Sequence, residues 1–223
     1  MANLPQTLTS HYDAEFQRLG LSETHRYLLG QIPPGCTVLE LGPASGYMTQ
    51  ILAGKGCVVD AIEINPQDAA KAAIYCRKMI VGSVEEAANF AELHGPYHVV
   101  LMADVLEHLC APENALNLVR EKLTPDGIAL VSLPNIAFWK MRWELLCGRF
   151  DYTDTGLLDR THLRFFTLKT AAAMFHAAGF RLTNAVVPPR QIPHLGRLKM
   201  AIMKAWPALF SINMVYHLRV DET

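Results

Sequence analysis

Apolar residues gather in short runs that alternate along the chain with segments carrying helix-start signals. Few polar residues interrupt these runs, which is typical of parallel strands buried on both faces of a sheet. Strands are expected over residues 38–41, 58–62, 78–81, 97–102, 128–133, 180–187 and 209–220. Helices are expected over residues 10–19, 22–29, 47–53, 67–75, 136–147, 168–178 and 194–206. The alternation predicts an α/β protein with a mostly parallel sheet.

A turn of small residues follows the first expected strand. Gly42, Ala44 and Gly46 keep side-chain bulk away from this turn, so that its backbone and the N–H groups of the next helix can approach a bound molecule. Glu63 follows the second strand, where doubly wound folds place a carboxylate against ribose hydroxyls. These positions predict a nucleotide-like ligand. Turns of this kind also occur in α/β proteins that bind nothing there.

The glycine spacing favours one cofactor over another. A dinucleotide fingerprint needs a third glycine where this chain has Tyr47. The run Glu40-x-Gly42-x-Ala44-x-Gly46 instead resembles the first motif of class I S-adenosylmethionine-dependent methyltransferases, [DE]-x-G-x-G-x-G, with Ala44 in place of the middle glycine. The resemblance implies cofactor contacts from this motif and from the end of the second strand, at Glu40, Gly42, Ala44, Gly46, Glu63 and Ile64.

A second motif follows the fourth strand. The run D-V-L-E-H-L from Asp104 to Leu109 is similar to the fourth motif of methyltransferases related to ubiquinone biosynthesis. Ala103 and Asp104 are therefore expected beside the cofactor, at the switch point of the sheet. Glu107 and His108 are interpreted as an acid on a helix face and a packed imidazole.

The third strand departs from the family pattern. Ser83 stands where the family usually has an Asp for the adenine amino group, so that Ser83 and Val84 are expected to contact the base. Glu85 is interpreted as a solvated helix residue. Taken together, the resemblance implies a Rossmann-like, seven-stranded, mostly parallel sheet with helices on both faces and a last antiparallel strand. It also implies S-adenosyl-L-methionine as the cofactor.

Residues 136–167 connect a strand to a helix over far more than the usual two to six residues or so, which is typical of a lid or binding element. The run from Gly156 to Thr167, G-L-L-D-R-T-H-L-R-F-F-T, resembles a signature of bacterial methyltransferases linked to polysaccharide and cell-surface biosynthesis. His162, with Asp159, is the candidate general base, because imidazole titrates near neutral pH. Alternatively, these residues only pin the loop to the sheet.

Length, charge and cysteines limit the remaining function classes. One domain is expected over residues 1–223, with 136–167 as a substrate lid and 190–208 as a smaller amphipathic insertion. The net charge of −1 argues against nucleic acid as a partner. The scattered cysteines indicate neither disulfides nor zinc, and no metal site is expected. With no leader and no long apolar run, a cytoplasmic location is expected, with peripheral membrane contact conceivable only through residues 194–206.

The sequence thus predicts an S-adenosylmethionine-dependent methyltransferase. Its acceptor is expected to be a small molecule or a saccharide- or lipid-linked cell-surface precursor. Two alternatives stay open. One is a non-catalytic protein that binds S-adenosylmethionine for regulation, and the other is an NAD-dependent oxidoreductase, which Tyr47 disfavours.

Overall fold

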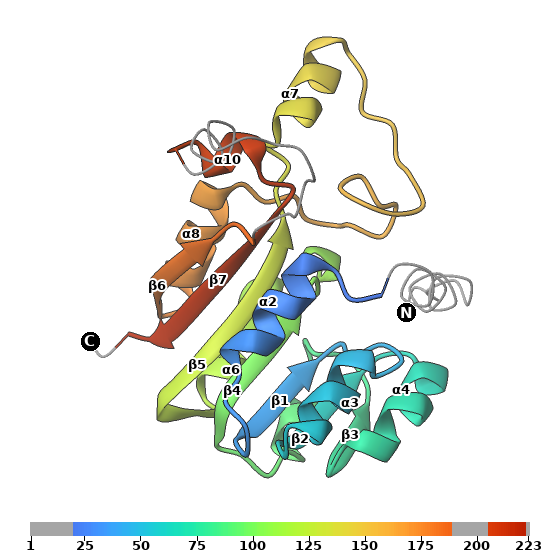
Figure 1. Cartoon of the computed structure of the whole chain (residues 1–223), viewed down its shortest axis with the longest axis vertical. Coiled ribbons are helices and arrows are strands. Elements are labelled where there is room, and N and C mark those ends of the chain that lie inside the picture. The colour runs from blue at the N-terminus through green and yellow to red at the C-terminus, as the bar shows by residue number, and fades with distance from the viewer. Residues whose placement is uncertain (1–19, 189–204, 222–223) are drawn as a thin grey trace.

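Seven strands form one sheet in the order β3-β2-β1-β4-β5-β7-β6, with helices on both faces (Figure 1). The computed structural model describes residues 20–188 and 205–221. Strands β1 to β5 are mutually parallel, and β7 is antiparallel to both β5 and β6. The predicted fold class is therefore confirmed. The strands are β1 Thr37–Leu41, β2 Val58–Glu63, β3 Lys78–Val81, β4 Tyr97–Ala103, β5 Leu123–Pro134, β6 Phe180–Val186 and β7 Asn213–Val220.

The helices begin where the sequence signals them. Ser22 caps α2 by accepting from the N–H of His25, and Asn65 caps α4 in the same way before Pro66. Thr167 and Thr170 form a reciprocal capping box at the start of α8. The helices are α2 Glu23–Gln31, α3 Tyr47–Gly54, α4 Pro66–Ala72, η1 Ala73–Tyr75, α5 Ala87–Ala91, η2 Leu106–His108, α6 Pro112–Arg120, α7 Trp139–Leu146, α8 Leu168–Ala177 and α10 Pro207–Phe210.

Strand β4 shows why its sequence is apolar throughout. Val99 and Leu101 belong to a core cluster that also contains residues of α2 and α3. Val100 and Met102 point the other way, into a cluster that contains residues of α6 and α8. Because successive side chains of a strand face opposite sides, both sides of β4 must be apolar. The sheet is thus the middle layer of three.

Two expected boundaries are wrong. The strand expected to begin at residue 128 begins at Leu123, as β5, in which Leu123 pairs with Tyr97 and Ile128 pairs with Val99, so the residues between Leu123 and Ile128 form an irregularity within the strand. The last strand begins at Asn213 rather than at residue 209, because Pro207 opens the short helix α10. The expected helix over 10–19, and that over 194–206 except for its last two positions, lie outside the described residues.

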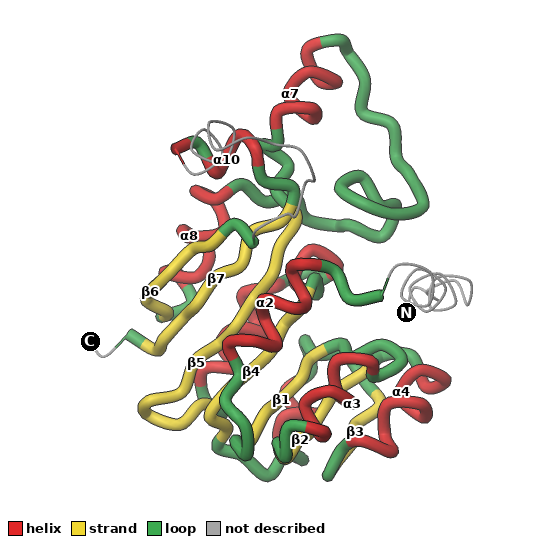
Figure 2. The backbone as a smooth tube through the Cα atoms, viewed as in Figure 1, coloured by secondary structure: helices red, strands yellow, loops and turns green. Residues whose placement is uncertain are grey.

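The connection from β5 to α8 leaves the sheet and returns to it. Helix α7 and the long irregular segment after it extend past the end of β5 (Figure 2). On its return, the backbone N–H groups of Leu163 and Arg164 donate to the carbonyl of Glu107, at 2.8 and 3.0 Å. The N–H of Ile136 donates to the carbonyl of Phe166, at 2.9 Å. No helix in the described part of the chain combines the length and the apolarity that a membrane span needs.

Candidate active site

The loop between β1 and α3 has left-handed backbone at each of its small residues. The φ angles are +64° at Gly42, +50° at Ala44 and +86° at Gly46. A Cβ added to Gly46 would lie 2.7 Å from the Cα and Cβ atoms of Ala72, and one added to Gly42 would lie 3.0 Å from the Val105 side chain. Glycine at these positions therefore also serves packing between protein segments, besides the access to a ligand that the sequence suggests.

Glu63 ties the end of β2 to this loop. Its buried carboxylate accepts from the backbone N–H of Ala44 at 2.9 Å and from that of Asn65 at 2.8 Å. Burial raises the pKa of Glu63, and these hydrogen bonds oppose the rise. A carboxylate offers about four acceptor positions, so it can still accept from ribose hydroxyls. The next residue, Ile64, is about half exposed beside it.

Glu40, like Glu63, is buried, and it lies within β1 in the middle of the sheet. It is buried in β1 and accepts from the Thr49 hydroxyl of α3 at 2.7 Å. Burial raises the pKa of Glu40 to about 7, although the Thr49 hydrogen bond and the nearby His25 act in the opposite direction. Glu40 therefore holds α3 against β1, and its predicted contact with the cofactor stays a prediction.

Asp104 follows the end of β4 at Ala103 and is held in a left-handed conformation, with φ +54°. Its carboxylate accepts from the Ser132 hydroxyl at 2.8 Å and lies 3.6 Å from Nε2 of His25. Burial alone would raise the pKa of Asp104, but His25 and Ser132 outweigh it and hold the pKa below its usual value. A charged carboxylate thus stands at the end of β4.

These groups meet at the switch point of the sheet. β2 and β3 lie on one side of β1, and β4 and β5 lie on the other side, so the strand order reverses direction at β1. In open α/β sheets, ligands bind in the crevice outside the carboxyl ends of the strands at this point. The glycine loop, Glu63 and Asp104 come from three different strand ends and are brought together there.

The end of β3 corrects one interpretation. Val84 is buried, and the Ser83 hydroxyl accepts from the N–H of Glu85 at 3.1 Å. Glu85 is not a solvated helix residue, because its carboxylate accepts from the N–H of Ala111 at 2.6 Å, at the start of α6. Contact of Ser83 and Val84 with an adenine stays a prediction.

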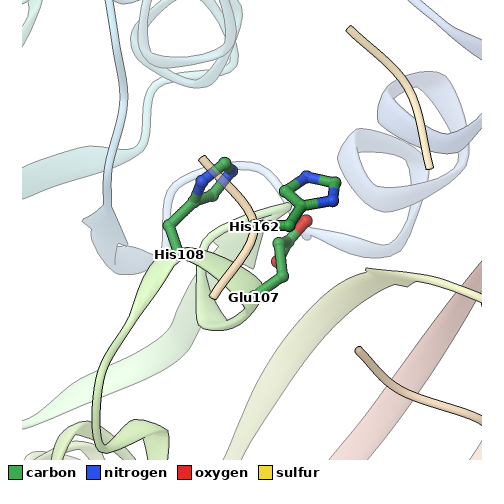
Figure 3. Close-up of side chains that lie close together, drawn as sticks. All are labelled: Glu107, His108 and His162. Atoms are coloured by element: carbon green, nitrogen blue, oxygen red, sulfur yellow. The ribbon is translucent and has the colours of Figure 1, made fainter. Parts of the chain in front are cut away.

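A second group of polar side chains lies where η2 meets the connection from β5 to α8 (Figure 3). Glu107 was expected on a helix face, but it is buried in η2, and neither of its carboxylate oxygens has a hydrogen-bond partner among the described residues. Burial, together with the charge of Asp104, raises the pKa of Glu107 well above its usual value. The ring of His108 packs edge-on against that of His162, with centroids 4.9 Å apart. Burial lowers the pKa of His108, and the neighbouring His162 lowers it further by a smaller amount.

The two predicted catalytic residues lie in one turn of the connection from β5 to α8. Asp159 is buried, and its Oδ1 accepts from the N–H and the hydroxyl of Thr161, at 2.8 and 2.7 Å. Nδ1 of the buried His162 lies 3.1 Å from the carbonyl of Leu157. These contacts hold the shape of the turn. The catalytic role of both residues stays a prediction.

A comparison with protein-family models identifies the chain. The model described as "Methyltransferase domain" matches residues 12–185, which is more than half of the sequence. The chain belongs to this methyltransferase-domain family. The predicted membership of the class I S-adenosylmethionine-dependent methyltransferases is therefore confirmed.

Relatives of this methyltransferase domain agree with the assignment. A ubiquinone biosynthesis O-methyltransferase from Caulobacter vibrioides is 30% identical over 105 residues, which are 45% of this chain and 42% of that protein. The match thus spans less than half of the length of the curated relative. A putative methyltransferase solved in complex with the Haloferax volcanii Trm112 activator has a TM-score of 0.67 at 13% identity, covering 98% of this chain and 100% of that chain.

A second similar solved structure contains ligands. It is the 1,6-didemethyltoxoflavin-N1-methyltransferase of Burkholderia thailandensis, with bound 1,6-didemethyltoxoflavin and S-adenosylhomocysteine. The TM-score is 0.59 at 19% identity, covering 96% of this chain and 88% of that chain. At such identities, the likeness to both solved structures shows the fold alone.

The residues of this methyltransferase domain fit S-adenosylmethionine, the cofactor of the class. The cofactor carries a positive sulfonium, an amino group and two ribose hydroxyls, all of which suit acidic partners. Glu63 and Asp104 supply carboxylates at the ends of β2 and β4, and the Glu63 carboxylate is fixed by the N–H of Ala44. Charged acceptors make stronger hydrogen bonds than neutral ones.

The connection from β5 to α8 exposes large apolar side chains. Trp139 and Trp143 of α7 are 49% and 56% exposed. Phe150, Tyr152 and Phe165 form an aromatic cluster after it, with Phe150 edge-on to both others at 5.6 and 5.5 Å between centroids. Such a concentration of exposed aromatic surface indicates contact with a partner or ligand. An open hollow of about 500 Å³ lies among α7, α8, β6 and α10, with Ala137, Arg142 and Thr167 of the β5–α8 connection in its lining, and none of the predicted site residues lines it.

Proposed function

We propose that this chain transfers the methyl group of S-adenosylmethionine to a small-molecule acceptor held between the strand ends and the lid. The observation that carries the proposal is the fixed carboxylate of Glu63 beside the glycine loop, in a chain of the methyltransferase-domain family. In the reaction, the bond from sulfur to the methyl carbon breaks as a bond from that carbon to the acceptor forms. S-adenosylhomocysteine leaves, and an acceptor hydroxyl or amine gives up a proton.

The contribution of the protein to this step is mainly alignment. An in-line displacement needs the acceptor atom close to the methyl group and opposite to the sulfur, and a pocket closed to water favours it. In this proposal, the strand ends hold S-adenosylmethionine and the lid covers the acceptor. The backbone contacts of Leu163 and Arg164 with Glu107 fix one end of the lid beside Asp104.

We assign the acceptor to small molecules with an apolar part, because the aromatic side chains of the lid are exposed rather than packed in the core. Two similar proteins carry names of methyltransferases that act in small-molecule chemistry, on oxygen in one case and on nitrogen in the other. A saccharide- or lipid-linked precursor is the second acceptor class, and it rests only on the loop motif that ends at Thr167.

His162 is the predicted base for the acceptor proton. Its Nδ1 faces the carbonyl of Leu157, which can only accept a hydrogen bond, so Nδ1 carries the hydrogen and Nε2 keeps its lone pair. Nε2 is therefore the atom that a proton transfer would use. Asp159 would support this proton transfer indirectly, because its hydrogen bond from the N–H of Thr161 holds the turn that carries His162.

The test is formation of S-adenosylhomocysteine by the full chain. Incubation with S-adenosylmethionine and a panel of phenols, amines and lipid-linked sugars should give this product, measured by mass spectrometry, with one acceptor class only. Product absent from every mixture, despite tight cofactor binding by calorimetry, would identify a non-catalytic binder. Binding of NAD in preference to S-adenosylmethionine would instead support an oxidoreductase.

A further inference from the structure

Three side chains that could together hold a metal ion meet where η2 contacts the connection from β5 to α8. One ligand atom from each of Glu107, His108 and His162 lies within 4.8 Å of the others (Figure 3). Glu107 and His108 come from η2 at the end of β4, and His162 comes from the lid turn. The two parts are far apart in the sequence, so no local spacing of ligand residues indicates this site, and none was expected from the sequence.

The Glu107 carboxylate lacks the partner that its burial calls for. It is 1% exposed, and neither oxygen accepts a hydrogen bond from any described residue. A buried polar group without a partner is costly, and buried charges are normally paired or coordinate a metal. The neighbouring acids Asp104 and Asp159 add negative potential at this point. A cation would pair with the Glu107 carboxylate and would be favoured by the two neighbouring acids.

Each of the two imidazoles has its Nδ1 at a backbone carbonyl. Nδ1 of His108 lies 3.2 Å from the carbonyl of Thr161, and Nδ1 of His162 lies 3.1 Å from the carbonyl of Leu157. Because a carbonyl only accepts, each Nδ1 carries the hydrogen and each Nε2 keeps a lone pair. Metal-binding histidines typically donate their other ring N–H to a backbone carbonyl or carboxylate, which fixes the ring.

We propose that this chain binds one divalent transition-metal ion, of the class of Zn²⁺, through Glu107, His108 and His162. Two imidazoles with one carboxylate suit zinc and its first-row neighbours, whereas Mg²⁺ and Ca²⁺ prefer sites built mainly of oxygen. Tetrahedral ligands at about 2.0–2.1 Å from zinc lie roughly 3.4 Å from one another, so a small inward shift of the side chains forms the site. A fourth position stays open to water or a ligand.

The ion joins the lid to the end of β4. It adds a bond between side chains where the backbone of Leu163 and Arg164 already contacts the Glu107 carbonyl. This proposal does not rest on methyl transfer, because it concerns binding alone. An Nε2 that binds a metal cannot also take a proton, so the base role proposed for His162 applies only to the metal-free chain.

The experiment is a metal titration of the full chain, produced without a metal-affinity tag and stripped with a chelator. Calorimetry with Zn²⁺ should show one ion per chain. Co²⁺ as a spectroscopic probe should give visible bands without a sulfur-to-cobalt charge-transfer band. Glu107→Gln and His162→Gln should each weaken Zn²⁺ binding by more than about 10-fold. His176→Gln, which changes an exposed histidine of α8, should leave it unchanged.

Folding of the variants is checked by circular dichroism and by melting without metal. Zn²⁺ should raise the melting temperature of the wild type and of His176→Gln, but not that of Glu107→Gln. The proposal is wrong if the stripped wild type takes up no zinc in excess metal, if Glu107→Gln and His162→Gln bind as tightly as the wild type, or if a thiolate band appears. All these measurements omit cofactor and acceptor, so their failure is separate from a failure of the proposed methyl transfer.

Discussion

At the scale of residues, Glu63 offers the most direct test of the cofactor site. Its carboxylate is held by Ala44 and Asn65 and keeps acceptor positions for two hydroxyls. Glu63→Gln removes the charge and one of the two acceptor oxygens. We expect S-adenosylhomocysteine to bind about 1–3 kcal/mol more weakly, because charge-assisted hydrogen bonds are lost. Calorimetry measures the change.

The matched control for this prediction is Glu92→Gln. Glu92 is an exposed glutamate that pairs with Lys78 at the surface, at 3.2 Å. Its substitution should leave cofactor affinity unchanged. Equal affinities of the wild type and Glu63→Gln would remove Glu63 from the cofactor site.

Glu40 predicts a pH dependence of stability. Burial raises its pKa from 4.5 to about 7, against the effects of Thr49 and His25. Between these pH values, the folded state still holds a proton that the unfolded chain has released, so this group destabilises the fold as pH rises through the window. The free energy of unfolding falls by on the order of 3 kcal/mol, and the whole decrease is reached once the pH exceeds the pKa of Glu40 in the folded state.

Glu40→Gln keeps an oxygen for the Thr49 hydroxyl but cannot ionise. The free energy of unfolding, measured by urea denaturation from acid to neutral pH, should therefore fall less in this variant than in the wild type. Parallel curves for the two proteins would show that Glu40 ionises in the folded state at its ordinary pKa. Other titrating groups, such as Asp104 and His108, act on both proteins alike.

Residues whose place depends only on a strand end could be predicted from the sequence. Glu63 and Asp104 follow apolar runs, and the carboxyl ends of parallel strands share one edge of the sheet. Glu107 could not be placed, because its burial depends on the returning lid. The Glu85 contact with Ala111 could not be predicted either, because it joins two segments that are far apart in the sequence, the end of β3 and the start of α6.

At the scale of elements, Gly46 decides how closely α3 and α4 pack. Gly46→Ala places a methyl group 2.7 Å from Ala72 and forces a side chain into φ +86°. We expect a loss of roughly 2–4 kcal/mol of stability, by the sum of strain and overpacking. Chemical denaturation measures it.

Gly54→Ala in the same helix is the control. An added Cβ there meets no atom within 4 Å, and its φ is not positive, so this variant should be as stable as the wild type or slightly more stable. Because the Cα of Ala72 is also 2.7 Å from the added Cβ, the double variant Gly46→Ala with Ala72→Gly should stay destabilised. Full rescue would contradict the packing argument.

Helix α7 predicts a separate effect on the acceptor. Trp143 is 56% exposed and contributes little to the core. Trp143→Ser should raise the KM for the acceptor roughly 10-fold, the equivalent of about 1.4 kcal/mol of apolar contact, while kcat, the melting temperature and cofactor affinity stay the same.

Steady-state kinetics with the identified acceptor test this. Ile74→Ser, at a residue of η1 that is 76% exposed, is the matched control and should leave KM unchanged. An unchanged KM in Trp143→Ser would take α7 out of the acceptor site. The sequence predicted a helix over residues 136–147 but not where it lies, because hydrophobic periodicity does not show how a long connection folds back.

At the scale of the whole molecule, cofactor binding should stabilise one half of the sheet. S-adenosylmethionine at about 100 times its dissociation constant adds about 2.7 kcal/mol to the free energy of unfolding. Hydrogen exchange should slow at the N–H groups of Ala44 and Asn65, which donate to Glu63, and much less in β6. NAD at the same concentration should change neither quantity. Uniform protection across the sheet would argue against a site at the switch point.

The position of β7 has a consequence for how the protein is made. Among the described strands, β7 is the last in sequence, yet it lies between β5 and β6 and is the only strand that pairs with β6. On the ribosome, residues 180–186 emerge before the strand that must separate them from β5. Until residues 213–220 follow, the growing chain carries an open sheet edge at β5 that other nascent chains can pair with. The emergence of residues 213–220 is therefore also the step that protects this sheet edge from aggregation.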